Sequence, residues 1–185
     1  MKRIGLFGGS FDPVHTGHLL VARTALESLA LDRLFFLPAA QSPFKPGQPL
    51  TSGALRARLL RLALAGWTCC EVDTLELERG DVSYTIDTVR VFARRFPEAM
   101  LFWLIGGDHL PLLPHWREAD ALAELVEFAV VPRPGVEVGP GPGAPFRIRV
   151  LGAAEHDRGV RHPGAGAGGA IARGSCAGAG GRGDP

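Results

Sequence analysis

Residues 8–18 read Gly-Gly-Ser-Phe-Asp-Pro-Val-His-Thr-Gly-His and lie between an apolar run and an amphipathic segment. The apolar run at 4–7 is typical of a buried strand, and apolar side chains recur at helical spacing over 18–30. Glycines let the backbone approach a ligand closely and expose amide N–H groups, and a helix start adds the positive end of its dipole. We therefore expect a strand, a loop and a helix start that together receive a phosphate group.

Two histidines at the end of this stretch are the first candidates for catalysis. His15 and His18 stand three residues apart, so at a helix start both side chains can face the same anion. Two other interpretations remain open: a tight turn with two solvated histidines, and a metal pair. The metal pair lacks a third ligand at a suitable spacing.

Apolar runs and amphipathic segments alternate through the rest of the chain. We expect strands at 34–37, 101–105 and 128–131, shorter strands at 71–73 and 75–77, and helices at 18–30, 54–65, 86–96 and 119–126. Apolar strands that alternate with amphipathic helices predict an α/β fold with a doubly wound parallel sheet covered on both faces. Ligands of such sheets bind beyond the carboxyl ends of the strands, where the strand order reverses.

The loops after the expected strands carry further candidates, each with a structural alternative. Asp108 could accept hydrogen bonds from ribose hydroxyls or cap a helix. Trp116 could stack on a flat heteroaromatic ring or pack in the core. Ser83 and Thr85 could cap a helix, and backbone amides at the same helix start could hold a carboxylate. Lys45, in a loop rich in proline and glycine, could bring a cation to a phosphate or remain solvated.

Several of these segments, in order along the chain, resemble the motifs of one family. Residues 8–18 resemble the HxGH signature of the nucleotidylyltransferases, and other segments resemble motifs of the bacterial nicotinate mononucleotide adenylyltransferases. These are Pro43-Phe44-Lys45 (the Pro-x-Lys loop), 56–63 (the Arg-x-x-Met-Leu helix), 83–88 (SYTxDT), 105–108 (IGxD), 113–116 (a substrate-stacking tryptophan) and 132–135 (the RPG strand end). The family more often has histidine where Phe44 stands.

The resemblance implies a Rossmann-like nucleotidylyltransferase fold and adenylyl transfer from ATP, used with Mg²⁺, to nicotinate mononucleotide in NAD biosynthesis. It implies catalytic roles for His15, His18 and Lys45, and no protein ligand to a metal. It also implies ATP contacts at Gly8, Gly9, Ser10, Phe11, Gly17, Gly106 and Asp108, and contacts to nicotinate mononucleotide at Ser83, Tyr84, Thr85, Trp116 and Arg133. The alternatives are an adenylyltransferase for phosphopantetheine, a cytidylyltransferase, and a nucleotide-binding protein without catalysis.

Composition limits the other classes of function. A chain of 185 residues has room for one domain, and a formal net charge of +1 argues against nucleic-acid or membrane-surface partners. No apolar stretch is long enough for a membrane span, and the first one is too short for a signal peptide. The spacing of the three cysteines fits free thiols. We expect a cytoplasmic enzyme of small molecules, with homo-oligomerisation left open.

The composition changes abruptly near Leu151. Residues 152–185 include 11 glycines and 8 alanines, one serine and no threonine. So few sizeable apolar side chains cannot offset the entropy of ordering, and we expect a domain at 1–150 and a disordered tail at 151–185. In the family that the chain resembles, an Ile-Ser-Ser-Thr-x-Ile-Arg helix start follows, and nothing similar occurs here. Because glycine, alanine, arginine and proline have GC-rich codons, the tail is also consistent with a gene segment translated out of frame.

Overall fold

The structure is a computed structural model that describes residues 1–41, 43, 49–132, 138–139 and 141–152. Its elements are β1 (Arg3–Gly9), α1 (Thr16–Ser28), β2 (Arg33–Pro38), α2 (Gly53–Ala63), β3 (Cys70–Val72), α3 (Leu75–Arg79), α4 (Thr85–Arg95), β4 (Met100–Gly106), the 3₁₀ helix η1 (Gly107–His115), α5 (Ala119–Leu125), β5 (Glu127–Val131) and β6 (Ile148–Val150). The expected tail falls outside the described residues, so its disorder and its origin remain predictions.

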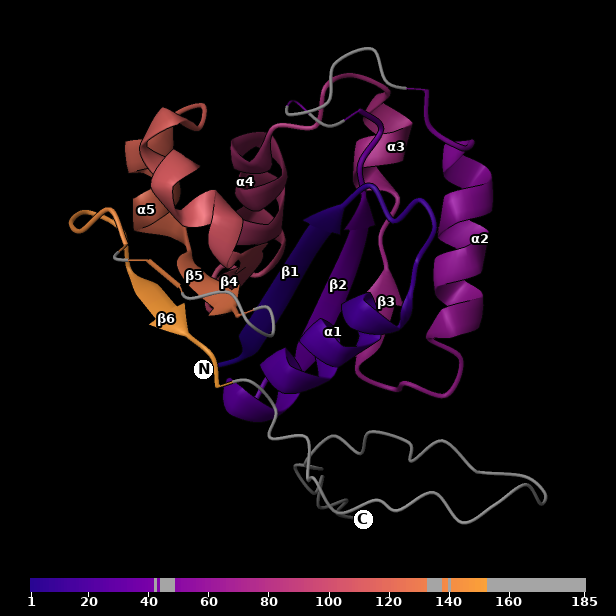
Figure 1. Cartoon of the computed structure of the whole chain (residues 1–185), viewed down its shortest axis with the longest axis horizontal. Coiled ribbons are helices and arrows are strands. Elements are labelled where there is room, and N and C mark those ends of the chain that lie inside the picture. Colours follow the sequence, from indigo (N-terminus) through magenta and orange to yellow (C-terminus); the bar gives the residue numbers. More distant parts are fainter. Residues whose placement is uncertain (42, 44–48, 133–137, 140, 153–185) are drawn as a thin grey trace, which may run out of the picture.

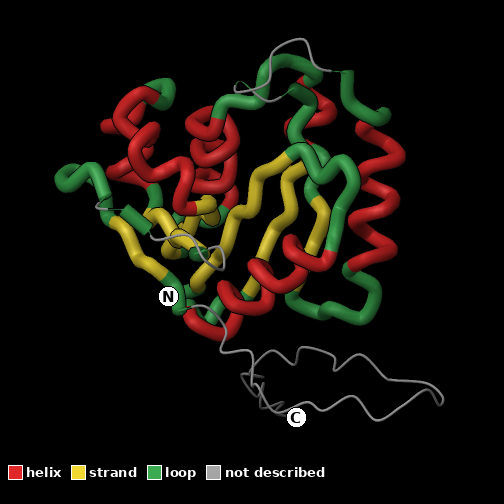
Figure 2. The backbone as a smooth tube through the Cα atoms, viewed as in Figure 1, coloured by secondary structure: helices red, strands yellow, loops and turns green. Residues whose placement is uncertain are grey.

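The strands form one parallel sheet in the order β3-β2-β1-β4-β5-β6, which confirms the doubly wound α/β fold (Figure 1). The chain runs outward from β1 to β3, returns to the centre, and then runs outward again from β4. The strand order therefore reverses between β1 and β4. Because all strands are parallel, the loops after β1, β2 and β4 lie at the same edge of the sheet (Figure 2).

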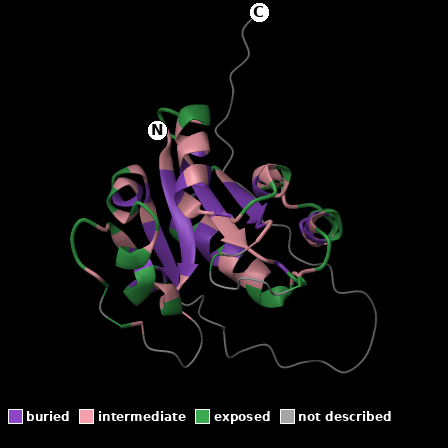
Figure 3. Cartoon of the chain, turned by 90° about the horizontal axis from the view of Figure 1, so that it is seen from above, coloured by how far each residue is buried: buried purple, intermediate pink, exposed green. Residues whose placement is uncertain are grey.

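Two layers of helices cover the sheet, and most residues of the central strands between them are buried (Figure 3). On one face, buried residues of the strands pack with Ala22 and Ala25 of α1 and Leu60 of α2. On the other face they pack with Phe92 of α4, Leu122 of α5, and residues of η1. The apolar runs of the central strands are explained by this arrangement, because both faces of each strand meet a helix.

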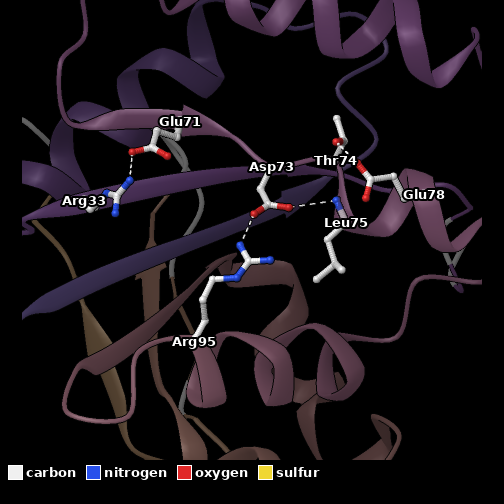
Figure 4. A network of polar contacts seen from close by, with 7 residues as sticks. All are labelled: Arg33, Glu71, Asp73, Thr74, Leu75, Glu78 and Arg95. Carbon is white, nitrogen blue, oxygen red and sulfur yellow. Dashed lines mark hydrogen bonds and ion pairs between the residues drawn. The ribbon is translucent and has the colours of Figure 1, made fainter.

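The structure corrects one expected strand. Leu75–Arg79 is the helix α3, although its alternation of leucine and glutamate is typical of a strand. The helix starts after Asp73, whose carboxylate accepts a hydrogen bond from the Leu75 amide at 2.9 Å and a second from Arg95 of α4 (Figure 4). It ends at Gly80, which adopts the left-handed conformation that favours glycine.

Two further features differ from the expectations. The sequence analysis missed β6, a short strand beside β5, and the 3₁₀ helix η1 that carries the residues after β4. Cys70 is a free thiol, as expected, and burial raises its pKa to about 12. Within the described part of the chain, no helix is long and apolar enough to cross a membrane.

Candidate active site

The loop after β1 is anchored by the side chain of Phe11. The ring is 2% exposed and lies 5.3 Å from the ring of Phe7 and 5.6 Å from that of Phe36, measured between centroids. The backbone of Phe11 is left-handed, with φ of 47°, which costs about 1–3 kcal/mol in a residue other than glycine. Burial of the aromatic ring offsets this cost. The backbone of Phe11 is therefore the only part of this residue that is available for the expected contact with ATP.

Close packing surrounds three of the expected phosphate-binding glycines, most tightly Gly8. A Cβ atom at Gly8 would lie 2.8 Å from the ring of Trp103, and one at Gly17 would lie 3.0 Å from the ring of His15. A Cβ atom at Gly9 would lie 3.3 Å from the ring of Phe11. The loop thus approaches the core and the histidines at distances that leave little room for side chains.

His18 is held in one orientation by the backbone of His15. The Nδ1 atom of His18 accepts a hydrogen bond from the His15 amide at 3.2 Å, at the start of α1. The two imidazole rings lie 3.8 Å apart between centroids, and the ring of Phe11 lies 4.9 Å from that of His18. An Nδ1 atom that accepts a hydrogen bond carries no proton, so the neutral ring holds its proton on Nε2. His18 therefore offers one N–H donor, from Nε2.

The charge state of His18 follows from its surroundings. Burial lowers the pKa of His18 to about 4, with a smaller contribution from the neighbouring His15. The ring is therefore neutral at physiological pH in the ligand-free protein, and it would meet a phosphate as a hydrogen-bond donor. A bound anion would raise this pKa, because a negative charge favours the protonated ring.

This shift predicts a pH-dependent stability. Because the pKa of His18 in the folded state lies below its ordinary value of 6.5, its contribution is present above pH 6.5 and is lost as the pH falls through about 4. We expect the free energy of unfolding to fall more steeply over this range in the wild type than in His18→Gln, which does not titrate. Urea unfolding at several pH values measures the free energy of unfolding of the wild type and of His18→Gln. Parallel profiles would show that His18 is not held neutral by the fold.

The loop after β2 and the start of α4 are joined through Ser83. Its hydroxyl oxygen accepts a hydrogen bond from the Ala40 amide at 3.1 Å, and its own amide donates to the carbonyl of Gln41 at 2.9 Å. Ser83 is only 7% exposed. Its hydroxyl does not cap α4, and it lies too deep to be a main contact for a substrate, so the structure places it as a support of the loop.

A buried carboxylate completes this support. Glu76 of α3 is 3% exposed and accepts a hydrogen bond from the hydroxyl of Thr88 at 2.7 Å. Arg79 donates to the same hydroxyl oxygen at 3.2 Å. Burial raises the pKa of Glu76, while hydrogen bonds from Thr88 and Ser83 act in the opposite direction. The residues at 83–88 that resemble a family motif thus serve partly to fix α4 against α3.

Tyr84, one of the residues expected to bind the acceptor, lines a cavity beside this support. The cavity, of about 340 Å³, is lined by Arg79, Asp81, Val82, Tyr84, Asp87 and Arg117. The guanidinium of Arg117 lies 4.7 Å from the centre of the Tyr84 ring, and Thr85 begins α4 next to it. Trp116 is half-buried and meets Phe128 edge-to-face at 6.1 Å, so core packing describes it in the ligand-free chain. Arg117, the residue after Trp116, is therefore brought beside the start of α4.

The end of β4 contributes Gly106 and Asp108. Gly106 ends the strand, and Asp108 follows in the first turn of η1 with its carboxylate exposed at the sheet edge. Lys45 and Arg133 lie outside the described residues, so their expected roles remain predictions. No cluster of three or more His, Cys, Asp or Glu side chains that could hold a metal occurs among the residues that the structure describes.

The sequence analysis assigned Arg56 only to a helix and missed its place beside the loop after β1. Its side chain is 2% exposed and donates to the carbonyl oxygens of Ser10 at 2.6 Å, Ala39 at 2.8 Å and Thr51 at 2.8 Å. The carboxylate of Asp12 accepts a hydrogen bond from the Thr51 amide at 2.8 Å. A signal was present, because Arg56 shares the apolar face of its helix with Leu60, four residues later.

The doubly wound sheet, with a glycine loop and two histidines where its order reverses, defines a nucleotide-binding domain of the nucleotidylyltransferase class. Residues 6–160 match the family model described as cytidylyltransferase-like. A probable nicotinate-nucleotide adenylyltransferase of Opitutus terrae is 48% identical over 74% of this chain and 70% of its own length. One of Gemmatimonas aurantiaca is 46% identical over 85% of this chain and 71% of its own.

The chain therefore belongs to the nicotinate-nucleotide adenylyltransferase family, within the cytidylyltransferase-like group. A solved structure, the Plasmodium falciparum nicotinic acid mononucleotide adenylyltransferase complexed with NaAD, shares its fold with a TM-score of 0.69. The match covers 82% of this chain and 75% of that one, at 16% sequence identity. The expected family and the expected fold class are confirmed.

Proposed function

We propose that this enzyme transfers the adenylyl group of ATP to nicotinate mononucleotide, forming deamido-NAD and pyrophosphate. The observation that carries the proposal is the loop after β1, where His18 presents a neutral Nε2–H donor beside a helix start at the reversal of the strand order. Identities of 46–48% to probable nicotinate-nucleotide adenylyltransferases support the choice of acceptor.

The proposed reaction is a direct displacement at phosphorus. A phosphate oxygen of nicotinate mononucleotide attacks the α-phosphorus of ATP, a new P–O bond forms, and the bond to the bridging oxygen of the β-phosphate breaks. Pyrophosphate takes the electron pair of that bond. Since no covalent intermediate is required, the protein contributes position and stabilisation of charge.

The proposed roles of the residues combine the geometry of the described residues with the resemblance to the family. The Nε2–H of His18 would donate to an oxygen of the α-phosphate, and the amides of Gly9, Ser10 and Phe11 would bind phosphate oxygens. Lys45 would add a cation from its loop. Asp108 would accept hydrogen bonds from ribose hydroxyls, and Tyr84, Thr85 and Trp116 would hold the pyridine ring and its carboxylate. Mg²⁺ would enter with ATP, held mainly by the phosphate oxygens, and would neutralise charge on the leaving group.

The direct test is pyrophosphate release measured with ATP and each acceptor in turn. We expect release with nicotinate mononucleotide and none with phosphopantetheine or with CTP in place of ATP. Release only with phosphopantetheine would indicate an adenylyltransferase for that acceptor, and release only with CTP would indicate a cytidylyltransferase. ATP binding without release for any acceptor would indicate a nucleotide-binding protein without catalysis.

We also propose that the catalytic domain ends near residue 150. The Leu151 amide donates to the carbonyl of Val130 at 2.8 Å and its side chain is buried, so the chain is still part of the fold at this point. If residues after Leu151 contribute nothing to the site, a chain ending there should keep its kcat/KM within about twofold. A larger loss would assign them a role. Reading the other frames of the coding DNA past Leu151 tests the out-of-frame explanation, which fails if none encodes a Ser/Thr-rich turn followed by an amphipathic helix.

A further inference from the structure

Arg56 is a buried cation whose hydrogen bonds go to backbone carbonyls. Its Nη1 reaches the loop after β1 at Ser10, its Nη2 the loop after β2 at Ala39, and its Nε the segment before α2 at Thr51. The three acceptors are far apart in sequence, and each belongs to a segment at the carboxyl edge of the sheet. Only the planar fork of arginine can serve three such acceptors at once, because lysine carries its donors on a single nitrogen.

Packing alone does not account for an arginine here. Burial lowers the pKa of Arg56, and the nearby carboxylate of Asp12 offsets this only in part. Asp12 is exposed and bonds to the Thr51 amide. An aliphatic side chain could fill much of the same space without the cost of desolvating a charge. The three carbonyl contacts therefore point to a role in holding the loops.

The contact with Ser10 also fixes the direction of a donor. The peptide unit that joins Ser10 to Phe11 is trans, since the cis bonds lie elsewhere. In a trans unit the C=O and N–H groups point in opposite directions. When the Ser10 carbonyl faces the guanidinium, the amide of Phe11 must face away from it, and the left-handed backbone of Phe11 turns the chain at this point.

We propose that Arg56 is a positioning residue for the nucleotide phosphates. It holds the Ser10 carbonyl so that the Phe11 amide is presented to the nucleotide, and it ties this loop to the loop after β2 and to the start of α2. The inference rests on the proposed function for the identity of the ligand, but the preorganisation of the loop is a property of the ligand-free chain. Arg56 itself touches no reacting atom.

The kinetic test compares Arg56→Met and Arg56→Lys with the control Arg58→Met, an exposed arginine on the same helix. We expect both Arg56 variants to lower kcat/KM for ATP by about 10- to 100-fold, because a misplaced donor loses much of its effect. At saturating ATP, the KM for nicotinate mononucleotide should change by less than about threefold, since Glu76 and Arg79 of α3 hold α4 at Thr88 without any contact to Arg56. Arg58→Met should match the wild type. Full activity of Arg56→Lys, or an equal rise of both KM values, would overturn the proposal.

Hydrogen exchange of the ligand-free proteins separates this inference from the proposed function. In Arg56→Met, exchange should quicken at the hydrogen-bonded amides of Ala39, Ala40 and Thr51, while the amides of β4 and β5 keep their rates. Unchanged exchange at these three amides would contradict the inference even if activity fell. If the wild type released no pyrophosphate with any acceptor but Arg56→Met showed the expected exchange pattern, the proposed function would be contradicted and the role of Arg56 in positioning the loop would remain supported.

A measurement on the wild type covers the case in which the variants do not fold. The amides of Ser10, Phe11 and Asp12 should have the same ps–ns order parameters as those of β1 before any nucleotide is added. Disorder of these three amides until a nucleotide binds would overturn the proposal, because a loop held by Arg56 is ordered in advance.

Discussion

Replacing His18 with alanine is expected to lower kcat for pyrophosphate release by about 10²- to 10³-fold, with little change in the affinity for ATP. The Nε2–H of His18 is fixed by the hydrogen bond from the His15 amide to Nδ1, so it needs no reorientation during the reaction. A donor placed in advance stabilises the charge that develops on the α-phosphate oxygens more than it stabilises the ground state. The expected loss therefore falls on kcat, measured at saturating concentrations of both substrates.

Two further substitutions at His18 identify the atom involved. The side-chain amide of glutamine can place an N–H near the position of Nε2, whereas that of asparagine reaches only the position of Nδ1. His18→Gln should therefore recover part of the lost kcat, and His18→Asn should not. A His18→Ala variant with nearly normal kcat would remove His18 from the reaction. Greater activity in His18→Asn than in His18→Gln would show that Nδ1, not Nε2, is the important atom.

The second large effect concerns the acceptor. We expect kcat/KM for nicotinate mononucleotide to exceed that for nicotinamide mononucleotide by about 10²-fold or more, because polar groups arranged for one ligand are left unpaired by another. A carboxylate gains from the amides at the start of α4 and from the cationic Arg117 beside Tyr84. The uncharged amide of the second substrate gains little from the same groups. Parallel steady-state assays with the two mononucleotides measure this ratio.

A matched pair of variants tests the source of the preference. Arg117→Met removes one of the two arginines that line the acceptor cavity, and Arg94→Met removes an exposed arginine from the last turn of α4. The ratio of kcat/KM for nicotinate mononucleotide to kcat/KM for nicotinamide mononucleotide should fall in Arg117→Met and stay unchanged in Arg94→Met. Equal kcat/KM values for the two mononucleotides in the wild type would contradict the assignment of this cavity to the pyridine carboxylate.

Local sequence determined the elements at the centre of this protein. Ile4, Phe36 and Phe102 belong to apolar runs that end in glycine or proline, and such runs become strands because helices cover both faces. The glycine-rich stretch at 8–18 predicted the loop between β1 and α1 for the same kind of local reason. Local sequence predicted short segments less well. The expected strand at 75–77 is part of a helix, because the Asp73 carboxylate caps its first amide.

The tertiary structure alone decided how the site residues act. The sequence placed His18 at a helix start, but only the contact with the His15 amide assigns its proton to Nε2, and only the fold lowers its pKa, through burial and the neighbouring His15. Ser83 supports a loop because Ala40, from a different part of the chain, supplies its partner. The sequence placed Arg56 on the apolar face of a helix, but only the fold brings the carbonyls of Ser10, Ala39 and Thr51 to its guanidinium. Contacts between segments far apart in sequence depend on how the whole sheet is wound, and no local pattern encodes them.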